Sequence, residues 1–445
     1  MSFVQDIKLA RDYIGKDLIT LPVPCFVLDR AKVRQNATRM IDKLAVLGIG
    51  LRVHVETLKC TPVVREALGN GKHSNVIAST LEEIRHLITL VEEGVVKDVL
   101  YGVPVGKSHV KELLYLRNLY RNFGASLHLL VDHPGQLDLV LDGTTSLREK
   151  WSVFVKVDIG VQLTGSPIDS PEFKLILSSI LNDAKYSKFF DIYGFYSHAS
   201  ANHSLEGRYD APSDFERELK GVLQAAENAR SLFKGERRSL SPNIEIKARQ
   251  SSSSPSILSS PRLSSAPSPS PPQRFILSVG SIPASHDLCQ QILNDPKNKL
   301  HTNDSLELHA GDFMSPDLLQ AGSSLAESLE MAGTVMTEIC SYYPARNEYL
   351  INAGGSALSH KSGPLPGIAH IYGNNDWIVS RVSQEYGIVS YVGDPTKVFK
   401  LPWKLGDRLR LYPQHACIAS SGHKLYFITD GRDTVVDVWN PWRYW

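Results

Sequence analysis

Reactive side chains follow several short apolar segments of this 445-residue chain. Lys59 lies just beyond one such segment. Tyr196 and His198 lie at the end of a second, and Gly280 and Ser281 follow a third. A lysine amine can act as a nucleophile or a base, and a glycine-containing turn offers backbone N–H groups to a phosphate. A solvated lysine and a simple structural turn are the alternatives that these residues alone leave open.

A second group of reactive residues lies near the C-terminus. His415 and Cys417 are two positions apart, so on an extended strand both side chains would point to the same face. An imidazole and a thiolate on one face suit two ligands of a single zinc ion. The alternative is a buried cysteine that happens to lie beside an unrelated histidine.

The elements that must position these residues alternate between strand-like and helix-like segments. Short β-branched runs alternate with longer helical patterns, which is typical of βα units and a parallel sheet. Asp29 can cap one helix, and Ser170 followed by Pro171 predicts the start of another. Eight strands that are each followed by a helix close most simply into a (β/α)8 barrel, with reactive residues at the C-terminal ends of the strands. The eight candidate strands are residues 25–28, 51–55, 75–78, 98–101, 127–131, 152–157, 192–196 and 275–278.

The predicted domain organisation follows from this pattern. The barrel is expected over residues 20–305, and a mainly antiparallel β domain that carries the zinc site over 306–445. Residues 1–19 are expected to join the β domain or to pack beside the barrel. A Ser/Pro-rich insertion at 248–273 interrupts the barrel, since 17 of the 22 residues from 251 to 272 are Ser or Pro, and we predict that it is disordered. The predicted strands of the β domain are residues 332–343, 349–352, 386–392, 408–411 and 424–429.

Composition limits the possible partners of the chain. Its 48 Lys and Arg against 47 Asp and Glu give no broad electrostatic case for a nucleic-acid or anionic-membrane partner, so a small-molecule ligand is expected. Its apolar runs are much shorter than the roughly 18 residues that a membrane-spanning helix requires. We therefore expect a cytoplasmic protein. The five widely spaced cysteines do not form the pattern of a disulfide framework.

Residues 51–62 (LRVHVETLKCTP) resemble the cofactor-lysine segment of the D-serine dehydratase and D-threonine aldolase family. Members of this family are pyridoxal-phosphate enzymes of the alanine-racemase fold, a (β/α)8 barrel followed by a β domain. The resemblance extends over roughly residues 21–431. It is carried further by PCFVLD at 24–29, KVDIG at 156–160, GFYSH at 194–198, SVGS at 278–281, ELHAG at 307–311, NAGGSALS at 352–359 and PQHAC at 413–417.

This resemblance implies a function. It implies that Lys59 forms the Schiff base with pyridoxal 5′-phosphate and serves as the base, that Tyr196, His198, Gly280 and Ser281 surround the cofactor, and that His415 and Cys417 bind zinc. The implied activity is that of a D-serine dehydratase, a lyase of D-amino acid metabolism that yields pyruvate and ammonia. Zinc would assist departure of the β-hydroxyl. A homodimer is also implied. The alternatives are a D-threonine-aldolase-like lyase and a cofactor-binding barrel with impaired catalysis.

The sequence departs from the family pattern at several positions. The pattern around the lysine is Arg-Pro-His-x-Lys-Thr-His-Lys, and here Val53, Glu56 and Leu58 replace its proline, inner lysine and second histidine. Further departures are Leu163, Ser200, Ile282 and Ala284. These changes concern the surroundings of the cofactor ring and phosphate, so they bear on activity more than on the fold.

Overall fold

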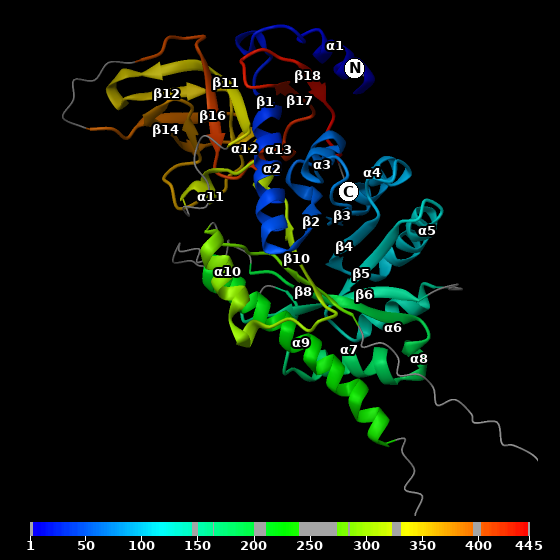
Figure 1. Cartoon of the computed structure of the whole chain (residues 1–445). Helices are drawn as coiled ribbons and strands as arrows, with labels where there is room; N and C mark the ends of the chain where they lie inside the picture. Colours follow the sequence, from blue (N-terminus) through cyan, green and yellow to red (C-terminus); the bar gives the residue numbers. More distant parts are fainter. Residues whose placement is uncertain are drawn as a thin grey trace, which may run out of the picture.

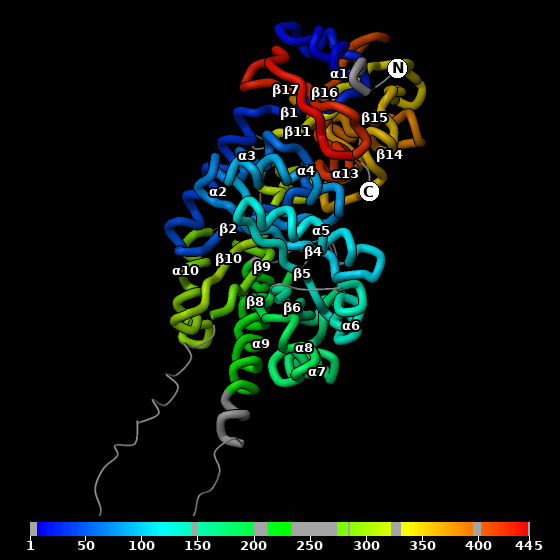
Figure 2. Tube along the Cα trace, turned by 90° about the vertical axis from the view of Figure 1, so that its right-hand side faces the viewer, coloured from blue at the N-terminus to red at the C-terminus, as the bar shows by residue number. Residues whose placement is uncertain are grey.

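The computed structural model describes residues 3–144, 150–162, 164–199, 211–239, 274–283, 285–322, 331–394 and 402–443. The predicted insertion at 248–273 lies outside these residues, as do Leu163, Ser200 and Ala284. A β domain occupies one end of the molecule and a barrel the other (Figure 1). The view turned by 90° shows the same separation (Figure 2).

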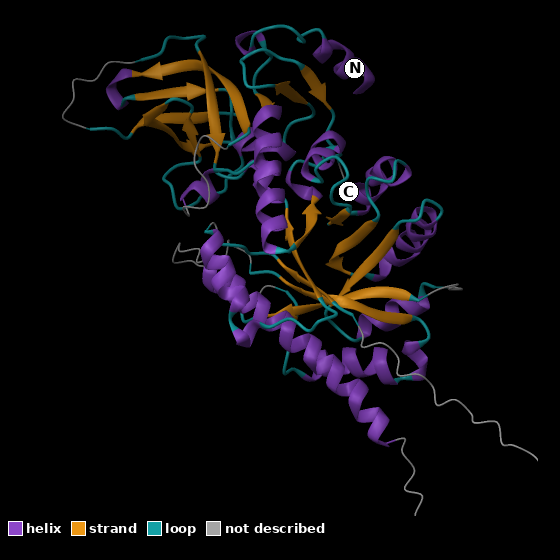
Figure 3. Ribbon diagram, in the orientation of Figure 1, coloured by secondary structure: helices purple, strands orange, loops and turns teal. Residues whose placement is uncertain are grey.

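Eight parallel strands form the barrel. They pair in the order β2, β3, β4, β5, β6, β8, β9, β10, and the pairing of β10 with β2 closes the ring. Helices lie outside the strands (Figure 3). The strands are β2 (Gly50–His54), β3 (Asn75–Ala78), β4 (Asp98–Pro104), β5 (Ser126–Val131), β6 (Trp151–Asp158), β8 (Phe190–Ser197), β9 (Ile276–Val279) and β10 (Ser305–Ala310), with the two-residue β7 (Ser166–Pro167) beside β6. The helices are α2 (Arg30–Leu47), α3 (Thr61–Ala67), α4 (Leu81–Glu92), α5 (Val110–Arg121), α6 (Gly135–Asp142), α7 (Pro171–Asn182), α8 (Ala184–Ser187), α9 (Ala211–Ser239) and α10 (His286–Asn294).

The helix starts that the sequence predicts are confirmed. The Asp29 carboxylate accepts from the backbone N–H of Ala31 at the start of α2, and the Ser170 hydroxyl accepts from the N–H of Phe173 in α7. Pro171 occupies the first helical position, where its missing N–H costs no hydrogen bond.

The first predicted barrel strand is misplaced. Residues 25–28 lie in β1 (Cys25–Asp29), which pairs with β11 (Gly333–Tyr343) and β17 (Tyr426–Thr429) of the β domain. All five β1 residues are buried, and its four apolar residues fit the centre of either sheet, so the local pattern does not reveal the partners of this strand. The eighth barrel strand is instead β10. The expected boundary between residues 305 and 306 therefore falls inside a barrel strand.

The β domain is built on one mainly antiparallel sheet. Six of its strands close on themselves, and β1, β17 and β18 continue the sheet from β11. The other strands are β12 (Glu348–Ile351), β13 (Ala369–Ile371), β14 (Asn374–Val382), β15 (Gly387–Tyr391), β16 (Arg408–Pro413) and β18 (Asp437–Trp439), and the sequence did not predict β13, β14 and β18. The short helices here are α11 (Leu318–Gly322), α12 (Gly355–Leu358) and α13 (Ala416–Ser421). The segment after α1 (Phe3–Arg11) joins this domain, because the N–H groups of Gly15 and Leu18 donate to the carbonyls of Val435 and Asp433.

Buried charges fill the half of the barrel nearest the N-terminal ends of the strands. Arg52 is fully buried, and its guanidinium donates to Glu307 at 2.6 Å and to Asp98 at 2.7 Å. His128 and Tyr193 both reach the second oxygen of Asp98, at 3.1 and 2.8 Å. Although burial acts to raise it, Arg52 and His128 hold the pKa of Asp98 well below its usual range. This network is part of the core and leaves ligand binding to the opposite end, the mouth of the barrel.

Candidate functional site

Aromatic side chains stack at the mouth of the barrel. The ring of Tyr196, from β8, lies 4.0 Å from that of His309, from β10. His309 is held at both nitrogens, since its Nε2 lies 3.1 Å from Nδ1 of His198 and its Nδ1 lies 3.0 Å from the hydroxyl of Ser278. Burial lowers the pKa of His198 to about 4 and that of His309 well below its usual value, so both imidazoles are neutral at pH 7. The structure therefore brings the predicted residues Tyr196 and His198 together, with His309 as an additional member.

Lys59 lies on the loop that follows β2. The chain makes one 3-10 turn, η2 (Val55–Thr57), and reaches Lys59 with a φ of 44°, in the left-handed region that costs energy for a residue with a Cβ. The Lys59 ammonium lies 2.9 Å from Oε1 of Glu83, a buried residue of α4. The other oxygen of Glu83 accepts from the N–H of Ser79 at 2.6 Å. The predicted Schiff-base amine is thus engaged in an ion pair with a buried carboxylate.

Glu56 lies on the same loop and acts on the aromatic cluster. Its carboxylate lies 3.7 Å from Nδ1 of His54 and accepts from the hydroxyl of Ser79 at 2.8 Å. The charge of His54 is the main cause that lowers the pKa of Glu56. Burial raises the pKa of Tyr196 well above its usual value, and the charge of Glu56 adds to this. The family pattern has two lysine positions, and this chain carries Glu56 at the inner one. Glu56 is therefore electrostatically coupled to Tyr196 and His198.

The turn after β9 forms an anion-binding nest with the end of β8. The backbone N–H groups of Gly280 and Ser281 donate to Oε2 of Glu218 at 2.6 and 2.9 Å. The N–H of Ala199 and the hydroxyl of Ser281, the latter at 3.0 Å, donate to Oε1. Glycine is required at 280, because a Cβ there would lie 2.0 Å from Nδ1 of His198. The donors are those that a phosphate would use, yet a carboxylate of the chain itself holds them, so a cofactor phosphate does not fit the nest in this structure.

The sequence prediction missed Glu218. It lies on α9 between the buried residues Phe215, Leu219 and Val222, on the face that packs against the strands. A glutamate at a position within the apolar stripe of an amphipathic helix is the sequence signal that could have revealed it. Burial raises the pKa of Glu218 to about 7, although the backbone donors act in the opposite direction.

The geometry expected for His415 and Cys417 is wrong. Strand β16 ends at Pro413, His415 caps the N-terminus of α13, and Cys417 is the second residue of that helix, so the pair does not lie on one face of a strand. Nδ1 of His415 lies 3.1 Å from Oδ2 of Asp317, which also accepts from the N–H of Ala416 at 2.8 Å. Sequence reasoning missed Asp317. The spacing of His415 and Cys417 alone does not show whether the backbone between them is extended or helical.

Acidic groups surround the thiol of Cys417. Burial raises its pKa well above the usual value, and the charges of Asp317 and Asp312 add to this. Burial together with the charge of Asp317 also raises the pKa of Asp312. Nitrogen, sulfur and carboxylate donors are zinc ligands by type. However, the described residues contain no group of three or more His, Cys, Asp or Glu side chains arranged to hold a metal.

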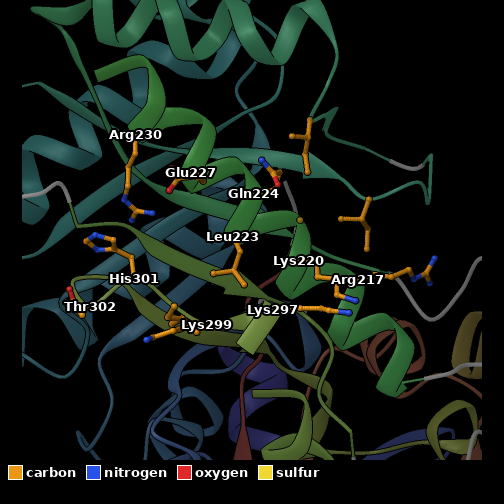
Figure 4. A pocket seen from close by; sticks show the side chains of 14 residues that line it. Arg217, Lys220, Leu223, Gln224, Glu227, Arg230, Lys297, Lys299, His301 and Thr302 are labelled. Carbon is orange, nitrogen blue, oxygen red and sulfur yellow. The ribbon is translucent and has the colours of Figure 1, made fainter. Parts of the chain in front are cut away.

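A separate cavity of about 980 Å³ lies beside α9. Figure 4 shows its basic lining, which includes Arg217, Lys220, Lys297 and Lys299, with Glu227 among them. None of the residues that the sequence predicts for the cofactor or the metal lines this cavity. The structure also describes three other positions at which the sequence departs from the family pattern. Val53 and Leu58 are buried, and Ile282 packs at the edge of the core.

The fold and the site together define a class. A closed parallel barrel with a lysine-bearing loop, an aromatic cluster and an anion nest at its mouth, joined to a β domain, is the architecture of the alanine-racemase fold. An alanine-racemase-like protein from Idiomarina loihiensis superposes with a TM-score of 0.72 at 20% identity, over 96% of this chain and 99% of that one. D-threo-3-hydroxyaspartate dehydratase from Delftia sp. HT23 superposes with a TM-score of 0.71 at 21% identity, over 96% and 100%. The predicted fold class is confirmed.

Sequence similarity gives the family. D-serine dehydratase of Schizosaccharomyces pombe is 33% identical over 449 aligned residues, which cover 98% of this chain and 95% of that protein. The family model described as "Putative serine dehydratase domain" matches residues 332–429. The chain belongs to the D-serine dehydratase family, which is a family of lyases. The family resemblance found in the sequence is therefore confirmed. In the described ranges, no helix is both long enough and apolar enough to cross a bilayer.

Proposed function

We propose that this chain is a D-serine dehydratase-type lyase that eliminates the β-hydroxyl of a small D-amino acid. The observation that carries this proposal is the 33% identity to a D-serine dehydratase over nearly the full length of both chains. The mouth of the barrel supports it. Here Lys59 lies on the loop after β2, and Tyr196 and His198 lie at the C-terminal end of β8. His415 and Cys417, at the start of α13, are residue types that can bind zinc. D-serine is the first substrate to test.

The residue roles within this proposal follow the family pattern. Lys59 is the amine assigned to pyridoxal 5′-phosphate, which when bound supplies an electron sink for Cα deprotonation. Tyr196 and His198 are assigned to the ring, and Gly280 and Ser281 to the phosphate. His415 and Cys417 are assigned to zinc. The phosphate does not fit while the carboxylate of Glu218 occupies the nest.

The experiment is product analysis on the purified full-length chain with added pyridoxal 5′-phosphate and zinc. D-serine should yield pyruvate and ammonia, whereas D-threonine would yield glycine and an aldehyde if the chain acted as an aldolase. Lys59→Ala should abolish pyruvate formation, and Lys72→Ala, at an exposed lysine of the α3–β3 loop, should leave it unchanged. Chelation of zinc should also suppress pyruvate formation. Pyruvate formed at the native rate by Lys59→Ala would remove this lysine from the proposal.

A second candidate is a barrel that binds an amino-acid-like or vitamin-B6-like ligand without turnover. The observation that favours it is the ion pair between Lys59 and the buried carboxylate of Glu83, together with the presence of Glu56 at the inner lysine position of the family pattern. A ligand bound with no product from either D-serine or D-threonine would favour this candidate. Glu56→Lys, which restores an amine at the inner position, would then be expected to create an absorbance band with pyridoxal 5′-phosphate.

A further inference from the structure

The mouth of the barrel contains a carboxylate where the chain offers binding groups for an anion. Glu218 is fully buried and reaches the turn after β9 from the middle of α9. Three backbone N–H groups and one hydroxyl converge on its two oxygens. Four neutral donors around one anion is the arrangement by which proteins hold phosphate oxygens without a counter-ion.

None of the donors of the nest belongs to α9. Gly280 and Ser281 belong to the turn after β9, and Ala199 follows β8, so neighbouring parallel strands direct these N–H groups toward one point. A buried carboxylate carries a large desolvation cost unless such donors offset it. Among the described residues no ion pair to Glu218 is formed, so the neutral donors are what stabilises its charge.

We propose that the Glu218 carboxylate is an internal substitute for a bound phosphate, and that it weakens the binding of phosphate-bearing ligands by this chain. A ligand phosphate can use the N–H groups of Ala199, Gly280 and Ser281 only after the carboxylate has left them. The apparent dissociation constant then equals the intrinsic constant divided by the fraction of molecules in which the nest is free. The inference rests on the proposed function only in placing the phosphate of the cofactor at this turn.

The test compares pyridoxine with pyridoxine 5′-phosphate, two ligands that differ only in the phosphate. Neither carries an aldehyde, so no lysine of the chain can form a Schiff base and Lys59 does not affect the result. Calorimetry at pH 8, where Glu218 is ionised, gives both dissociation constants for the full chain. The dissociation constant of pyridoxine divided by that of pyridoxine 5′-phosphate is a ratio that measures how much the phosphate contributes to binding.

We expect this ratio to rise about tenfold in Glu218→Ala, because the freed N–H groups become available to the phosphate. A rise of threefold or more supports the proposal, and a smaller rise or a fall overturns it. If Glu218→Ala does not fold, Glu218→Gln is measured against the same threshold, since a neutral amide competes less well for N–H donors. Glu216→Gln, on the same helix and in a surface ion pair with Lys220, is the matched control and should leave the ratio unchanged. Because no turnover is measured, failure of the pyruvate assay does not affect this result.

Discussion

At the N-terminal end of the barrel Arg52 meets the opposite charges of Asp98 and Glu307, whereas at the mouth the carboxylate of Glu218 meets only neutral donors. Both groups are fully buried. In the first region the partners are charged and belong to the barrel strands β4 and β10, so removal of one leaves the others without compensation. In the second region the donors are backbone groups that remain in place whatever occupies them. The first arrangement is committed to the fold, and the second can in principle exchange its occupant.

The largest effect is expected from Arg52→Met. Loss of the guanidinium leaves Asp98 and Glu307 buried without their cation, which should lower the free energy of unfolding by about 3–5 kcal/mol. Urea unfolding monitored by circular dichroism measures this change. Arg432→Met, at an exposed arginine after β17, should change the free energy of unfolding by less than about 0.5 kcal/mol. If the two variants were equally stable, the Arg52 network would contribute nothing to the fold.

A smaller, pH-dependent effect is expected at Glu218. Because its pKa is raised to about 7 from an ordinary value near 4.5, the folded chain binds more protons than the unfolded chain between these values. Ionisation of Glu218 therefore lowers stability as pH rises through this window, by on the order of 1–3 kcal/mol. Glu218→Gln removes this contribution, so the native stability minus that of the variant should fall between pH 4.5 and 7 and stay constant above it.

Histidine titrations do not obscure this difference. Burial lowers the pKa of His198 and His423 to about 4, so their contributions to stability are lost as pH falls below about 6.5. These groups are present in both proteins, and their contributions largely cancel in the subtraction. Urea unfolding at several pH values gives the curve. A difference that is independent of pH would mean that Glu218 titrates normally in the folded chain.

The smallest effect is expected at Lys59. Its side chain is 29% exposed, so its ion pair with Glu83 is partly screened, and Lys59→Ala should lower the free energy of unfolding by about 1 kcal/mol. In a Glu83→Gln background the same change should cost less, because the partner charge is gone. A double-mutant cycle measured without any ligand gives the coupling. A coupling of zero would show that the ion pair contributes nothing to folding and leaves the amine available for chemistry.

The sequence predicted the barrel, the β domain and most of their strands, because each of these features depends on a local alternation of apolar and turn residues. It did not predict the sheet to which β1 belongs, since a run of four buried apolar residues is compatible with both sheets. Glu218 was missed for a different reason. Its carboxylate comes from a helix more than 60 residues before Gly280, and only the tertiary structure shows that the two meet.

His415 and Cys417 illustrate the same limit of sequence-based prediction. The spacing of His415 and Cys417 was interpreted as a strand, while the chain turns into α13 directly after Pro413. Asp317 reaches His415 from a segment about 100 residues earlier. Metal-ligand types can be recognised from sequence, but their number and geometry depend on contacts of this kind.

The position of β1 between β11 and β17 means that the chain enters the β domain, leaves it for the whole barrel and returns. A fragment that starts after β10 would lack the strand that separates β11 from β17, and both strands would present unpaired backbone edges. Asp29 adds to this connection, since the carboxylate that caps α2 also accepts from the N–H of Gly431 at 3.1 Å. The barrel and the β domain are therefore not separable pieces of sequence, and the β domain can be completed only by a chain that still carries its N-terminal strand.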